Sequence, residues 1–92
     1  VFVESNFYTR FGEIDLIFFE KSSQTLVFVE VKYRRNDFFG SAIEMVTEEK
    51  QNRILVSSQV YLLKKNWDRN VRYDVVGVSK DSGNIEWLKN AF

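Results

Sequence analysis

Hydrophobic residues in this chain fall into five short runs separated by polar segments. The runs span 1–8, 13–20, 26–35, 71–78 and 85–88 and are rich in Val, Ile, Phe and Tyr. The segments between them, such as 10–12, 21–24 and 81–84, contain the glycines and small polar residues typical of turns. Short β-branched and aromatic runs bounded in this way predict five β-strands.

Between the third and fourth runs, from Thr47 to about Lys65, the apolar spacing changes to that of an amphipathic helix. Thr47 suits the N-cap position, and the acidic residues 48 and 49 suit the positive end of the helix dipole. The apolar stripe is expected to comprise Ile54, Leu55, Ser58, Tyr61 and Leu62. The loop 36–41 before the helix contains Phe38 and Phe39, which are expected to pack onto the core.

The spacing of these elements predicts the topology. The four-residue loop 21–24 has hairpin length, so the second and third strands should be antiparallel. A strand, a helix and a strand in succession predict a right-handed crossover, with the third and fourth strands parallel. The expected fold is therefore α/β, a mixed five-stranded sheet with a crossover helix, in a single domain over 1–92. Because the chain begins inside a strand and without Met, an N-terminal truncation is expected.

Composition narrows the possible chemistry. The chain contains no Cys and no His, which excludes thiolate catalysis, a histidine general base and Cys/His zinc sites. Any metal would need oxygen ligands, which favours Mg²⁺, Mn²⁺ or Ca²⁺. The 13 basic and 13 acidic residues balance, which counts against a strongly basic nucleic-acid binder. With no cysteine, signal peptide or bilayer-spanning run, we expect a cytoplasmic protein without membrane contact.

The third strand carries two charges where a buried strand should be apolar. Alternation places Glu30 and Lys32 on one face with Leu26 and Phe28. Counting outward from the hairpin loop pairs Glu20 with Thr25 and Asp15 with Glu30, so the two acids should share a face. A divalent cation would turn their repulsion into a binding site, and Lys32 would stabilise charge on a phosphate. Alternatively, Glu30 and Lys32 form an ordinary salt bridge at a strand end.

These residues resemble a known nuclease motif. The segments 12–17 and 27–32 resemble the Asp…Glu-x-Lys core of the restriction-endonuclease-like PD-(D/E)xK superfamily. More narrowly, the chain is similar to the YraN-like family of predicted endonucleases, themselves similar to archaeal Holliday junction resolvases. The resemblance continues through 39–41, 44–47, Lys50, 72–76 and 90–92. It implies that Asp15 and Glu30 are metal ligands, that Lys32 is the catalytic lysine and that Glu13 is an auxiliary acid.

By this resemblance the protein would be a Mg²⁺- or Mn²⁺-dependent endonuclease that hydrolyses phosphodiester bonds in branched or damaged DNA. By analogy with resolvases it would be a homodimer. Family members usually begin with a helix that carries a further Glu, and this restriction-endonuclease-like core lacks that N-terminal helix. The missing helix and the neutral charge leave an alternative: a non-catalytic module that binds nucleic acid or protein and retains the nuclease fold.

Several other polar residues have two interpretations each. Glu13 either assists the site or covers a turn, and Lys50 either approaches a phosphate or is a solvated helix residue. Arg34 and Arg35 either contact the nucleic-acid backbone or solubilise the exit of the strand. Asp74, which lies two residues after Arg72, is interpreted as structural.

Overall fold

The computed structural model describes residues 1–35 and 42–92, and in this part of the chain five strands form one sheet in the order β1-β2-β3-β4-β5. The expected packing of Phe38 and Phe39 therefore lies outside the described residues. The strands are β1 (Phe2–Thr9), β2 (Gly12–Glu20), β3 (Thr25–Arg34), β4 (Asn70–Ser79) and β5 (Ile85–Leu88). A 3-10 helix, η1 (Ala42–Met45), and an α-helix, α1 (Glu48–Lys64), lie between β3 and β4.

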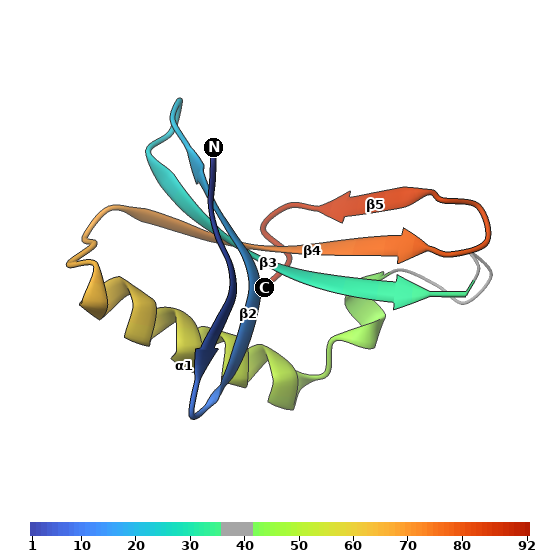
Figure 1. Ribbon diagram of the computed structural model, residues 1–92, viewed down its shortest axis with the longest axis horizontal. Coiled ribbons are helices and arrows are strands. Elements are labelled where there is room, and N and C mark those ends of the chain that lie inside the picture. The colour runs from blue at the N-terminus through green and yellow to red at the C-terminus, as the bar shows by residue number, and fades with distance from the viewer. Residues whose placement is uncertain (36–41) are drawn as a thin grey trace.

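The strand pairing confirms the predicted mixed sheet. β1–β2, β2–β3 and β4–β5 are antiparallel, whereas β3 and β4 are parallel along their whole length, from Thr25 opposite Asn70 to Arg34 opposite Ser79. Glu20 lies opposite Thr25, as the symmetric hairpin count predicts. The chain is thus an α/β fold whose crossover between β3 and β4 contains α1 (Figure 1).

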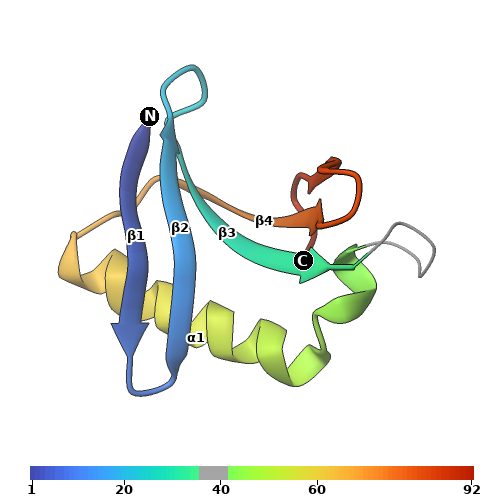
Figure 2. The same ribbon diagram turned by 45° about the vertical axis from the view of Figure 1, so that its right-hand side comes forward.

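Helix α1 covers one face of the sheet and runs across the strands (Figure 2). Between helix and sheet lies the main core, which includes Ile14, Ile17, Phe28, Tyr61 and Val75. On the opposite face a smaller apolar cluster contains the buried residues Val27, Val29 and Val76. In residues 1–35 and 42–92 no helix is long and apolar enough to cross a membrane.

The start and end of α1 follow from its sequence. Thr47 is the N-cap, as predicted, and its hydroxyl accepts a hydrogen bond of 3.2 Å from the backbone N–H of Lys50. Asn66 adopts a left-handed conformation with φ 52°, which ends the helix after Lys64. Lys50 therefore lies in the first turn of α1, at the end of the helix that is nearest β3.

The β1–β2 turn packs tightly against α1. A Cβ atom at Gly12 would lie 3.3 Å from the Cβ of Arg53, closer than most such contacts allow. The hydroxyls of Thr9 and Ser57 are hydrogen bonded at 2.9 Å, although the residues are 48 positions apart. These contacts fix the beginning of β2 against the helix, and so set the position of Asp15 relative to Lys50.

Candidate metal-binding and catalytic site

The face alternation of β2 breaks at Asp15. Ile14 and Ile17 both belong to the core under α1, whereas Leu16 packs on the opposite face. Regular alternation would have placed Ile14 and Leu16 on the same face. On the neighbouring strand Asn6 lies between the pairs Ser5–Leu16 and Phe7–Ile14 and has a positive φ of 52°. Asp15 therefore sits at a local irregularity of the sheet.

The Asp15 side chain contacts the backbone of β3. The β2–β3 ladder runs from Glu20–Thr25 to Leu16–Val29, and Asp15 and Glu30 occupy the next step. There the backbone N–H of Val31 donates a hydrogen bond of 2.8 Å to Asp15 Oδ2 instead of to a backbone carbonyl. The carboxylate thus takes the place of a ladder partner, which holds it beside Glu30.

The two acids share one cavity on the helix side of the sheet. It has a volume of about 180 Å³ and is lined by Gly12, Glu13, Asp15, Glu30, Lys50, Arg53 and Ile54. Glu30 is only 5% exposed. Burial, followed by the negative charge of Asp15, raises the pKa of Glu30, while the charge of Lys50 acts in the opposite direction. The two carboxyl groups are therefore close enough to repel each other.

Two lysines neutralise this pair of acids. Lys50 Nζ lies 3.3 Å from Glu30 Oε1, and Lys32 Nζ lies 3.8 Å from the same oxygen. Burial lowers the pKa of Lys32, and the adjacent Lys50 lowers it further. The pKa of Lys50 is raised, chiefly by its hydrogen bond to Lys32 and then by the charge of Glu30, although burial opposes this. The two amines are therefore close enough to influence each other's protonation.

The donor set fits a hard divalent cation. Asp15 and Glu30 offer carboxylate oxygens at one point, and Mg²⁺ is usually held by one or two carboxylates together with water and substrate phosphate. Among residues 1–35 and 42–92 no three acidic side chains come together as a possible metal site. Glu13 lines the cavity without completing such a trio. Asp15 and Glu30 are thus the residues that would hold the ion.

The predicted DNA-contacting arginines differ in their surroundings. One guanidinium nitrogen of Arg34 lies 3.7 Å from Glu86 Oε1 on β5, and the Arg34 side chain is only 13% exposed. The Arg34 guanidinium is therefore engaged within the protein rather than extended into solvent, which differs from both interpretations made from the sequence. Arg35 is exposed, and its backbone carbonyl accepts a hydrogen bond of 3.0 Å from the N–H of Asp81.

The site also contains a cation that we did not predict from the sequence. Arg53 lines the cavity with Lys50 and forms an ion pair with Glu49. Its spacing of three residues from Lys50 places both on one side of α1, so the signal was available in the helical periodicity.

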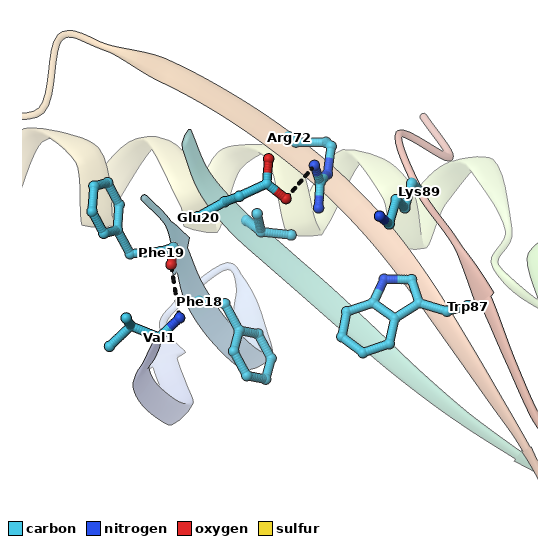
Figure 3. Close-up of a pocket in the computed structure, with 8 residues that line it drawn as sticks. Val1, Phe18, Phe19, Glu20, Arg72, Trp87 and Lys89 are labelled. Carbon is cyan, nitrogen blue, oxygen red and sulfur yellow. Dashed lines mark hydrogen bonds and ion pairs between the residues drawn. The ribbon is translucent and has the colours of Figure 1, made fainter. Parts of the chain in front are cut away.

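Asp74 lies in a separate network on the face of the sheet opposite α1, and it is completely buried. Arg72 donates two hydrogen bonds to its carboxylate, at 3.0 and 3.1 Å, and Trp87 Nε1 and the backbone N–H of Asn90 each donate one at 2.9 Å. Arg72 also binds Glu20 at 3.2 Å beside a cavity of about 380 Å³ (Figure 3). Because both oxygens of Asp74 are fully engaged, the structural interpretation is confirmed.

Comparison of the sequence with known proteins identifies the family of the chain. The chain matches the uncharacterised protein family UPF0102 over residues 1–78. A UPF0102 protein of Vibrio parahaemolyticus is 45% identical over 92 residues, which cover 98% of this chain and 74% of that protein. A UPF0102 protein of Nitrosococcus oceani is 44% identical over 97% of this chain and 73% of its own length. The chain therefore belongs to the UPF0102 family, in agreement with the YraN-like resemblance of its motifs.

Proposed function

We propose that this protein is a metal-dependent endonuclease of the PD-(D/E)xK type that hydrolyses phosphodiester bonds in DNA. The observation that carries the proposal is the convergence of Asp15 and Glu30 in one cavity, with Lys32 and Lys50 around the Glu30 carboxylate. Two acids and a lysine in this arrangement serve the hydrolysis of a phosphodiester, which needs charge neutralisation and an activated water.

The residues divide this work between them. Asp15 and Glu30 would hold Mg²⁺ or Mn²⁺, which when bound supplies Lewis-acid activation of water and phosphate. Lys32 is next to Glu30, and its lowered pKa suits it to accept a proton from the attacking water. Lys50 and Arg53 lie at the same cavity and suit the negative charge of a DNA phosphate.

The alternative is a binding module without catalysis. It is favoured by the zero net charge and by the engagement of Arg34 and Arg72 with acidic partners, which leaves fewer cations for DNA. This alternative predicts binding of nucleic acid or protein without turnover in Mg²⁺ or Mn²⁺.

Cleavage of labelled linear duplex and four-way junction DNA tests the proposal. We expect cleavage with Mg²⁺ or Mn²⁺, none with EDTA, and a loss of about 100-fold or more in Asp15→Asn, Glu30→Gln and Lys32→Ala. Asp68→Asn and Lys21→Ala are matched controls. Both side chains are exposed, and neither lines the cavity or takes part in its ion pairs. Wild-type cleavage by folded Asp15→Asn or Glu30→Gln would refute the proposed site. Light scattering of the same samples tests the expected homodimer.

A further inference from the structure

Lys50 makes the shorter of the two ion pairs with Glu30, although it belongs to a different element. It reaches Glu30 Oε1 at 3.3 Å from the first turn of α1, whereas Lys32 on β3 itself lies at 3.8 Å. The Lys50 side chain is 42% exposed, compared with 17% for Lys32. Lys50 is thus both the closer counter-ion and the one with more freedom to move into solvent.

Glu30 needs such a partner when no divalent cation is bound. Its side chain is 6% exposed and lies beside the Asp15 carboxylate in the same cavity. An ionised carboxylate that is buried without a counter-ion is costly. A cation held by Asp15 and Glu30 would neutralise the same carboxylate that Lys50 contacts. The ammonium and the divalent ion therefore compete for Glu30.

We propose that Lys50 is a displaceable counter-ion, which occupies the Glu30 carboxylate in the metal-free protein and leaves it when a divalent cation binds. This inference rests on the proposed metal site. Lys32 stays in place because it lies opposite Gly77 in the β3–β4 ladder and its side chain is largely enclosed. The released Lys50 ammonium remains at the cavity beside Arg53, where a phosphate would approach.

If Lys50 merely supported the metal site, removing its charge would weaken metal binding. A displaceable counter-ion predicts the opposite change in affinity. Removing the Lys50 charge should tighten metal binding, because the divalent ion no longer displaces an ammonium. Because the Lys50 side chain is 42% exposed, solvent screens much of its attraction to Glu30, and we expect a roughly fivefold lower Kd. Without metal, the same change should destabilise the protein, since buried Glu30 loses its closer partner.

Calorimetric titration with Mn²⁺ tests this at mildly alkaline pH and fixed ionic strength. Lys50→Met keeps the aliphatic stem and should bind Mn²⁺ about fivefold more tightly than the wild type. In EDTA its Tm should be lower, and saturating Mn²⁺ should raise the Tm by more than in the wild type. Lys50→Gln is a second neutral variant, should Lys50→Met fold poorly, and Lys50→Arg should keep the wild-type affinity. Lys21→Met is the control for loss of an exposed lysine.

The results separate the two proposals. If Mn²⁺ binding depends on Asp15 and Glu30 but is unchanged or weaker in both neutral Lys50 variants, the counter-ion inference is overturned and the metal site stands. If the wild type binds no Mn²⁺, or binds it equally well after Asp15→Asn and Glu30→Gln, both proposals are overturned.

Discussion

Replacement of Asp74 by alanine should destabilise the protein severely without involving the candidate active site. Asp74 is fully buried and accepts hydrogen bonds from Arg72, Trp87 and Asn90. Its loss would leave the half-buried Arg72 guanidinium with Glu20 as its remaining acidic partner. Asp74 also lies opposite Val29 in the β3–β4 ladder, so the damage would reach the central strand.

The magnitude follows from the kind of contact that is lost. Removing one member of a buried ion pair costs about 3–5 kcal/mol, because the remaining charge keeps its desolvation penalty. The indole N–H of Trp87 also loses its acceptor, which adds to this cost. At about 4–8 °C per kcal/mol for a domain of this size, the Tm should fall by roughly 12–40 °C.

Thermal and urea unfolding followed by circular dichroism measure this change. Asp68→Ala removes an exposed aspartate and should change the free energy of unfolding by less than about 0.5 kcal/mol. Asp74→Asn preserves the shape and should fall between Asp74→Ala and the wild type. A loss below about 1 kcal/mol in Asp74→Ala would refute the reasoning, because it would mean that the four hydrogen bonds to the buried carboxylate contribute almost nothing to stability.

Two further predictions concern packing and pH. Gly77→Ala would place a Cβ 2.5 Å from the Cβ of Ala42, so we expect the free energy of unfolding, measured in urea, to fall by about 1–3 kcal/mol. Adding Ala42→Gly should partly restore it, and an unchanged unfolding midpoint in Gly77→Ala would contradict the contact. Hydrogen bonds from Ser23 and Arg72 lower the pKa of Glu20 below its ordinary value of 4.5, so its contribution to stability is present above that pH and is lost as the pH falls through the lowered pKa. Glu20→Gln should therefore lower the Tm at neutral pH but not in strong acid, and an equal difference at all pH values would exclude this coupling.

The fold could be predicted from the sequence because local signals agree with tertiary structure. The apolar runs, the loop of four residues and the Thr47 cap each specified an element or a connection without reference to distant residues. The hairpin count likewise gave the Glu20–Thr25 pair correctly. The boundaries moved only slightly, for example from 1–8 to Phe2–Thr9 for the first strand.

The site was less predictable because it depends on a local irregularity. The hairpin count predicted that Asp15 and Glu30 would share a face, and they do share a cavity, although the alternation of β2 is irregular between Ile14 and Ile17. The bond from the Val31 N–H to the Asp15 carboxylate has no signature in the sequence. Lys50 was assigned two interpretations because only the packing of α1 decides how near its amine comes to Glu30.

The irregularity at Asp15 opens this residue to both surfaces of the sheet. On the α1 side it lines the cavity shared with Glu30, and on the opposite side it lines a second cavity of about 310 Å³ together with Tyr33 and Val31. A ligand seated over one surface would leave the other entrance free. Substitution of Asp15 would therefore alter the lining of two cavities at once, one on each surface of the sheet.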